Sequence, residues 1–379
     1  MRAATVERWR ADRLDRRVRE VRERARHLPA EADPDMALQH NTWDDVEIEE
    51  EQRTRAEAEV RSQHRAPPAV AEACVREAAL RWDAHYLQNI RNYHDRKYLH
   101  NEFPPLRAPL GKAVILETGC GVGNTLLPLL AAHSAVRLVG CDLSPFAVRC
   151  VNERLEREGL AARGRAFVWD IAAPPPVDQL QPHMLQADLV LAVFTLSAIS
   201  PDRLGTAFSN LYDSLRPGGR LLIRDYGRLD SKQLKFCRAP NGRLGGEDGL
   251  EWYCRGDGTT VVFFTLDAIL ALATQSGFEV EDLRYDRRLM VNRAQHTRLY
   301  RVWVVAVLRK PMDNGKASKH TTFTSRRLPH ACVRLWGLAT ETRRARHSML
   351  ALVFTVLVSR MAAPYCIQTL RRAALSFRA

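Results

Sequence analysis

The sequence predicts an α/β domain with a mostly parallel sheet and helices on both faces. Between residues 76 and 310, short apolar segments alternate with segments of helical periodicity, which is typical of parallel strands joined by helices. The first apolar segment runs into a glycine-rich turn that opens a helix, and the second ends on Asp142. This order is typical of a Rossmann-like fold that binds a ligand at the carboxyl ends of its strands.

The individual elements follow from composition and from turn signals. Ser144 and Pro145 predict the N-cap and the first residue of a helix. The Pro-Gly-Gly sequence at 217–219 predicts that the preceding helix stops there and that the chain returns as a strand. The expected helices span residues 126–132, 145–158, 203–215 and 267–276. The expected strands, seven in all, span residues 114–117, 137–142, 166–170, 187–194, 220–225, 278–284 and 300–308.

Charge divides the chain into three expected zones: a charged, helix-prone extension (1–75), the α/β domain (76–311) and a basic tail of low order (312–379). Residues 1–30 carry ten arginines against five acids, and residues 312–379 carry twelve basic residues against two acids. The overall charge of +13 therefore leaves about −2 for residues 31–311. The total charge alone does not predict RNA binding by the α/β domain.

Composition favours a reduced intracellular compartment, and we expect a cytoplasmic protein. The eight cysteines form no C-x-x-C pair and no cluster at metal spacing, so we expect no structural zinc. The arginine-rich start also carries acids, which a mitochondrial presequence normally lacks, although that alternative stays open. The apolar run 349–358 is too short for a membrane span, which needs about 20 residues.

The glycine-rich turn predicts a site where a ligand lies close to the backbone. Gly119, Gly121 and Gly123 permit a tight turn without Cβ clashes. Asp142 lies 23 residues after Gly119, where a carboxylate can accept both ribose hydroxyl hydrogens of an adenosine ligand. Asp170, at the end of the third expected strand, can meet the adenine amino group.

A nicotinamide dinucleotide is the natural rival ligand. Its G-x-G-x-x-G fingerprint requires a glycine where this chain has Asn124. That difference, together with the Arg-Pro-Gly-Gly turn at 216–219, favours S-adenosylmethionine.

Beyond the turn, the chain resembles the tRNA N3-methylcytidine methyltransferases over residues 41–311. The Arg-Asp-Tyr-Gly block (224–227) and the Arg-Gly-Asp-Gly-Thr block (255–259) are the most specific matches, because methyltransferases in general lack them. The other matching stretches are residues 43–47, 82–86, 95–96, 102–104, 119–125, 141–145, 196–199, 201–202, 222–223, 253–254, 263–265, 286–288, 291–293 and 300–303.

The resemblance implies a class I S-adenosylmethionine-dependent methyltransferase acting on cytidine in the tRNA anticodon loop. It further implies that Trp82 and Tyr86 lie over the cofactor, although their spacing alone would favour a helix face packed on the core. The residues implied to line the cofactor are Gly119, Asp142, Asp170, Ile171 and Val193. A helper protein, such as an aminoacyl-tRNA synthetase or an anticodon-binding protein, is also implied.

The chemistry leads to candidates for the transfer step. Ring nitrogen N3 of an unpaired cytosine attacks the sulfonium methyl in line, so the ring gains positive charge. We expect the Asp225 carboxylate to stabilise that charge and Tyr226 to stack on the base. Arg96, Arg288 and Arg301 are expected to hold the exocyclic oxygen or flanking phosphates, with ordinary ion pairs as the alternative.

Departures from the family pattern leave other functions open. Lys97 and Tyr98 stand where the family has His-Trp, only one aromatic of the preceding pair remains, and Ser200 replaces a histidine. One alternative is methylation of a protein or small molecule, against which the block 255–259 argues. Another is a non-catalytic RNA-binding subunit, against which the intact glycines and Asp142 argue.

Overall fold

The computed structural model describes residues 40–88, 94–107, 109–176, 186–237, 242–246, 249–292, 294–295 and 297–312. The chain divides into two units, residues 1–313 and 314–379, and all described residues belong to the first. The arginine-rich start, the basic tail and the apolar run 349–358 lie outside the described residues. The expected zone boundaries therefore stay a prediction.

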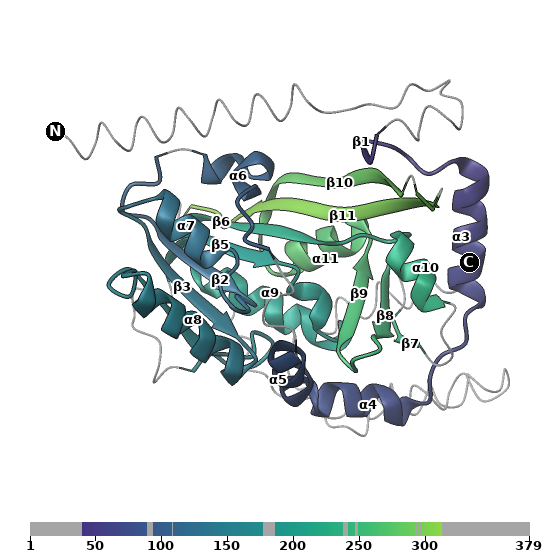
Figure 1. The fold of residues 1–379 in the computed structure, drawn as a ribbon, viewed down its shortest axis with the longest axis horizontal. Helices are drawn as coiled ribbons and strands as arrows, with labels where there is room; N and C mark the ends of the chain where they lie inside the picture. The colour runs from purple at the N-terminus through teal and green to yellow at the C-terminus, as the bar shows by residue number, and fades with distance from the viewer. Residues whose placement is uncertain are drawn as a thin grey trace, which may run out of the picture. The chain divides into compact units, whose positions relative to one another are not determined.

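Two sheets form within the described residues (Figure 1). The larger one is eight-stranded, in the order β1-β10-β11-β6-β5-β2-β3-β4. Its parallel half consists of β4 (Gly164–Val168), β3 (Arg137–Asp142), β2 (Val114–Thr118), β5 (Ala187–Val193) and β6 (Leu215–Tyr226). Its antiparallel half adds β11 (Thr297–Arg309), β10 (Glu279–Asn292) and β1 (Thr42–Asp44).

The seven expected strands all lie in this sheet, and the fold class is confirmed. The number of strands was one too low, because β1 adds an eighth at the edge beside β10. Trp43 in β1 is buried against Leu289 and Val291, which holds this short strand in place. Three residues are too few for a period-two pattern to show in sequence.

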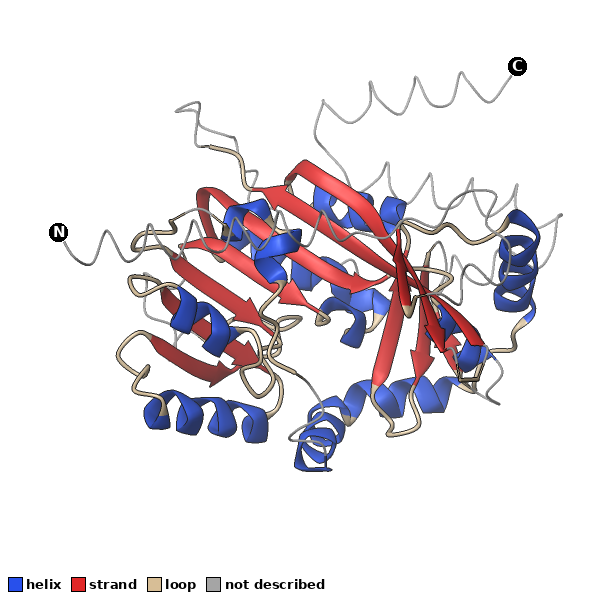
Figure 2. Cartoon of the chain, turned by 45° about the horizontal axis from the view of Figure 1, so that its top comes forward, coloured by secondary structure: helices blue, strands red, loops and turns tan. Residues whose placement is uncertain are grey.

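Helices cover both faces of the sheet, as Figure 2 shows. Alternate residues of each strand point to opposite faces: Leu138 belongs to the cluster beneath α7 and α8, whereas Val139 belongs to the cluster that also includes residues of α9 and α11. The first face is covered by α6 (Leu99–Glu102), the short helix η1 (Pro104–Leu106), α7 (Leu126–Ala132) and α8 (Pro145–Arg157). The second is covered by α9 (Leu204–Asp213) and α11 (Leu266–Gln275).

A smaller antiparallel sheet, absent from the sequence-based prediction, packs beside α9 and α11 within the same core. Among the described residues it has three strands, and Val262 and Phe264 reach the cluster that covers the second face. The strands are β7 (Arg243–Gly245), β8 (Leu250–Cys254) and β9 (Thr260–Phe264). The remaining elements are α3 (Glu50–Ser62), α4 (Pro68–Arg76), α5 (Ala78–Gln88), η3 (Leu196–Ala198), η4 (Pro201–Arg203) and α10 (Ser231–Cys237).

Several expected boundaries were wrong. The third strand ends at Val168, so Asp170 follows it by two residues instead of closing it. The turn at 216–219 lies within β6, because Leu215 pairs with Ala187 and the Gly218 N–H donates to the Lys310 carbonyl at 2.9 Å. The strand expected over 278–284 continues to Asn292, because its charged residues remain paired with β11.

Candidate cofactor and substrate site

A pocket lies at the edge of the sheet where β2, β3, β4 and β5 end. Because parallel strands present their carboxyl ends on one edge, residues from four turns meet there. The pocket is lined by Cys74, Val75, Ala78, Trp82, Tyr86, Gly119, Asp142, Leu143, Trp169, Asp170, Ile171, Phe194, Thr195, Ala198, Ile199, Ser200, Arg203, Trp252 and Thr260.

The turn after β2 needs its glycines. Gly119 and Gly121 have φ angles of +60° and +53°, which lie in the left-handed region. A Cβ on Gly119 would collide with the side chain of Thr195, and one on Gly121 would lie 2.9 Å from the Tyr86 hydroxyl. The turn therefore runs against the wall formed by Thr195 and Tyr86 with no room for side chains.

Asp142 is buried at the base of the pocket and is held by two backbone groups. Its carboxylate accepts hydrogen bonds from the Gly121 N–H at 2.8 Å and from the Ser144 N–H at 2.9 Å. Burial raises the pKa of Asp142 to about 6, although both hydrogen bonds favour the ionised form. Asp142 therefore connects the glycine turn to the start of α8.

The expected cap of α8 is confirmed, and it explains how α5 is positioned. The Ser144 hydroxyl accepts from the Ala147 N–H and itself donates to the Asp83 carboxylate. Asp83 also accepts from the Phe146 N–H at 3.1 Å. Asp83 lies on α5, so this acid binds the N-terminus of α8 from a different helix, which its sequence position did not indicate.

Trp82 and Tyr86 lie on the pocket wall as a consequence. Their ring centroids are 5.9 Å apart, and both residues line the pocket together with Gly119 and Asp142. Val193, by contrast, is buried in the core, and the next residue, Phe194, lines the pocket instead. Phe194 has a φ angle of +58°, which turns the chain out of β5 at this point.

Asp170 and Ile171 line the opposite part of the pocket. The Asp170 carboxylate pairs with the Arg203 guanidinium at 2.6 Å and accepts from the Ala172 N–H at 3.0 Å. Arg203 comes from η4 and lines the same pocket, yet sequence reasoning missed it. Its neighbours Pro201 and Asp202 were recognised only as part of a matching stretch, so no chemical signal marked the arginine.

Asp225 is fully buried at the end of β6. Its carboxylate accepts from the Ser197 N–H and from the Tyr226 N–H, both at 2.9 Å. Burial raises the pKa of Asp225 to about 6. Among the described residues that line the pocket, Asp225 and Tyr226 do not appear. Tyr226 lies behind the pocket lining, with its ring centroid 5.1 Å from that of Phe194, which does line the pocket.

Arg96 lies beside the glycine turn. Its backbone N–H donates to the Asn124 carbonyl at 2.7 Å, and its guanidinium donates to the Thr125 hydroxyl at 3.2 Å. The guanidinium carbon is 5.7 Å from the centroid of the Phe194 ring. The structure thus brings Arg96, Phe194 and Tyr226 together next to the pocket.

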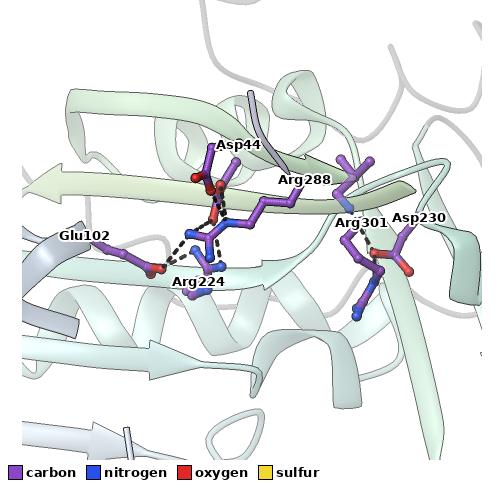
Figure 3. Close-up of polar contacts among 8 residues, drawn as sticks. Asp44, Glu102, Arg224, Asp230, Arg288 and Arg301 are labelled. Atoms are coloured by element: carbon purple, nitrogen blue, oxygen red, sulfur yellow. Dashed lines mark hydrogen bonds and ion pairs between the residues drawn. The ribbon is translucent and has the colours of Figure 1, made fainter. Parts of the chain in front are cut away.

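Arg288 and Arg301 lie in ion pairs, as Figure 3 shows. Arg301 binds the buried Asp230 at 2.8 Å. Arg288 binds Asp286 at 3.2 Å and Asp44 at 3.4 Å. These contacts match the ion-pair alternative considered for both arginines, and the structure does not bring them to the pocket lining.

The described residues contain no group of three or more His, Cys, Asp or Glu side chains arranged to hold a metal ion. They also contain no helix whose length and apolar character would let it cross a bilayer.

The sheet order, the glycine turn and Asp142 define a class I S-adenosylmethionine-dependent methyltransferase. In agreement, residues 116–221 match the family model described as "Methyltransferase domain". Solved structures that resemble the chain include a SAM-dependent methyltransferase from Methanosarcina mazei (19% identity, TM-score 0.43, 57% of this chain and 97% of that one). Another is 1,6-didemethyltoxoflavin-N1-methyltransferase from Burkholderia thailandensis (20% identity, TM-score 0.42, 66% and 94%).

Curated relatives identify the family within this class to which the chain belongs. The tRNA N(3)-methylcytidine methyltransferase Mettl2 of Drosophila melanogaster is 39% identical over 289 residues, which cover 73% of this chain and 85% of the relative. The tRNA N(3)-cytidine methyltransferase METTL2 of Xenopus tropicalis is 34% identical, with 76% and 94% covered. The tRNA(Thr) (cytosine(32)-N(3))-methyltransferase of Saccharomyces cerevisiae is 36% identical, and the chain covers 45% of its length. The chain belongs to the tRNA N3-methylcytidine methyltransferase family.

Proposed function

We propose that this protein transfers a methyl group from S-adenosylmethionine to N3 of a cytidine in the anticodon loop of tRNA. The proposal depends mainly on one observation: the glycine turn, Asp142 and the aromatic residues of α5 all line the same pocket. Membership of the tRNA N3-methylcytidine methyltransferase family supports the choice of substrate.

The pocket fits the cofactor. Gly119 lines the pocket, and the positive φ angles of Gly119 and Gly121 let the turn pack directly against Thr195 and Tyr86, so that its backbone borders the pocket. Ionised Asp142 would accept the ribose hydroxyls, and Asp170, oriented by Arg203, would meet the adenine amino group. Trp82, Tyr86 and Ile171 would cover the ligand, while Gly123 and the buried Val193 support the turn and the strand end behind it. When bound, the cofactor supplies an electrophilic methyl group on a sulfonium.

The substrate base would enter from the side of Phe194 and Tyr226. Tyr226 would stack on the cytosine, and Arg96 would bind its exocyclic oxygen or a flanking phosphate. Asp225 is buried beneath these side chains, where the Ser197 N–H of η3 donates to its carboxylate. It would therefore stabilise the positive charge that develops on the cytosine ring electrostatically, without direct contact. Its hydrogen bonds also fix Ser197, next to the pocket-lining Ala198.

Arg288 and Arg301 remain candidates for RNA phosphate contacts. Each is paired with a carboxylate, which offsets part of its charge. Their contribution to tRNA affinity should therefore be smaller than that of Arg96.

The function is tested by mass spectrometry of nucleosides from tRNA incubated with the protein and S-adenosylmethionine. We expect N3-methylcytidine with the wild type. Asp142→Ala should lose cofactor binding, whereas Asp225→Asn should bind the cofactor normally and lose at least tenfold in transfer rate, since removing one electrostatic contact commonly costs about a hundredfold. Normal turnover by Asp225→Asn would remove its proposed role, and methyl entering only protein would refute the substrate.

We also propose that a helper protein assists tRNA binding and that the protein acts in the cytoplasm. The near-neutral charge of residues 31–311 supports the first point, because a surface without excess positive charge binds tRNA weakly. Addition of an aminoacyl-tRNA synthetase should then lower the KM for tRNA. An unchanged KM with each candidate helper would argue against this requirement.

A further inference from the structure

The turn between β8 and β9, residues 255–259, has no role in the site described so far. Asp257 fixes its shape by accepting from the Thr259 N–H at 3.0 Å and from the Thr259 hydroxyl at 2.7 Å. The Gly258 N–H closes the turn on the Arg255 carbonyl at 2.9 Å. Burial disfavours ionisation of Asp257, but the hydrogen bonds from Thr259 and His85 outweigh it and lower the pKa of the carboxyl. The turn thus presents an ionised acid.

This turn contacts α5 at three places. His85 Nδ1 lies 2.8 Å from the second carboxylate oxygen of Asp257, and an ionised carboxylate can only accept, so Nδ1 carries the hydrogen. Arg81 donates to the Gly258 carbonyl at 2.6 Å. The Arg255 guanidinium carbon lies 5.8 Å from the centroid of the Trp82 ring. Arg81 and His85 are four residues apart, so one side of α5 faces the turn.

The adjacent side of α5 carries Trp82 and Tyr86, which line the pocket. Asp83 attaches the same helix to the N-terminus of α8. Beyond the turn, the Thr260 hydroxyl donates to the carbonyl of Ala198, and both residues line the pocket. The turn therefore connects α5, whose Trp82 and Tyr86 line one part of the pocket, to η3, whose Ala198 lines another part.

We propose that residues 255–259 form a latch that holds α5 against the pocket, through Asp257 on His85 and the Gly258 carbonyl on Arg81, and so set the affinity for the cofactor. The proposal rests on the proposed function only in taking S-adenosylmethionine as the ligand of this pocket. His85, Arg81 and Asp257 are positioning residues, because they act through Trp82 and Tyr86. The block 255–259 then serves the cofactor site in addition to any contact with RNA.

Two glycines of the turn provide a matched pair of variants. Gly258 has a φ angle of +81°, and an added Cβ would lie 2.9 Å from the Arg81 guanidinium. An added Cβ on Gly256 would meet nothing within 4 Å. His85→Phe keeps a ring beside Trp82 and Tyr86 but has no hydrogen to donate to Asp257, so it breaks the contact from the α5 side and leaves the turn unchanged.

The test measures the Kd for S-adenosylhomocysteine by calorimetry, and kcat and both KM values in tRNA methylation. We expect His85→Phe and Gly258→Ala each to raise the Kd about fivefold, the loss typical of one hydrogen-bonded pair. Gly256→Ala should bind like the wild type. The KM for tRNA, and kcat at saturating S-adenosylmethionine, should stay within twofold of the wild type in all three. Adding Asp257→Asn to His85→Phe should cause no further loss, since both changes remove the same contact.

Other outcomes would overturn the latch. Wild-type affinity in His85→Phe, with a loss only in Gly258→Ala, would mean that the turn matters for its own structure. A higher KM for tRNA with an unchanged cofactor Kd would place the block in RNA binding alone. If the wild-type protein bound no S-adenosylhomocysteine, the proposed function itself would fall, which is distinguishable because every variant would then behave alike.

Discussion

Asp142 shows how one residue links the fold to the proposed chemistry. It is buried because it closes β3, and it stays near the pocket because the backbone of Gly121 and Ser144 holds its two oxygens. Burial raises its pKa to about 6, above the ordinary value of 3.8. Its charge is therefore present at neutral pH but is lost in mildly acidic solution.

Cofactor affinity should consequently fall in acid. Only the ionised carboxylate accepts both ribose hydroxyl hydrogens, so the Kd for S-adenosylhomocysteine should be constant above pH 7 and rise about tenfold for each pH unit below 6. Asp142→Asn should bind more weakly and show no rise over this range. Calorimetry between pH 5 and 8 checks this, and an equally steep rise in the variant would assign the titration to another group, such as the buried Glu117.

Individual residues were predictable from sequence to different degrees. The glycines and Asp142 follow from the order of strand, turn and acid, which local chemistry determines. The position of Trp82 on the pocket wall depends on Asp83 bridging to α8, a contact between segments 61 residues apart. Arg203 gave no signal, because Asp170 was expected to meet the adenine and its ion pair with Arg203 joins residues 33 apart in the chain.

At the scale of elements, the glycine turn after β2 is the most constrained segment of the site. Both Gly119 and Gly111 have φ angles near +60°, but only Gly119 lies against another side chain, that of Thr195. The two positions therefore separate the cost of backbone strain from the cost of a steric clash.

Gly119→Ala should abolish detectable cofactor binding and lower the free energy of unfolding by about 3 kcal/mol, the sum of strain and overpacking. Gly111→Ala should cost only about 1 kcal/mol, because it meets nothing within 4 Å, and should bind cofactor normally. Urea unfolding and calorimetry of both variants check this. Equal effects in the two would mean that the contact with Thr195 is unimportant.

Sequence patterns located the elements with local signals best. The cap at Ser144, the helix 126–132 and the strand 137–142 were located to the residue because capping, periodicity and turn signals are local. The small sheet β7–β9 and the second half of β10 were missed, because their residues are stabilised by distant partners such as β11. The block 255–259 could be recognised in sequence, but its contact with α5 could not.

For the folded unit as a whole, a buried charge cluster joins segments far apart in the chain (Figure 3). Arg224 of β6 binds Glu102 of α6 and Asp286 of β10, both at 2.8 Å, and its side chain is only 4% exposed. Arg288 extends the cluster to Asp44 of β1. The cluster thus holds the N-terminal strand and α6 against the sheet next to Asp225.

Removing Arg224 should destabilise this unit strongly. Arg224→Met removes the buried cation between Glu102 and Asp286 and leaves them only the more exposed Arg288, which should lower the free energy of unfolding by about 3 kcal/mol. The control Arg216→Met breaks an ion pair with Asp188 in which the arginine is about half exposed, and should cost less than about 1 kcal/mol. Urea titration of both variants provides the comparison, and similar losses would show that burial of the cluster adds nothing.

The pocket at the carboxyl edge is the central claim, and a crystal structure with S-adenosylhomocysteine tests it most directly. We expect the adenosine to lie between Asp142 and Asp170, with the glycine turn beneath it and Trp82 and Tyr86 over it. Density for the ligand elsewhere on the molecule, or an empty pocket at saturating ligand, would contradict the account.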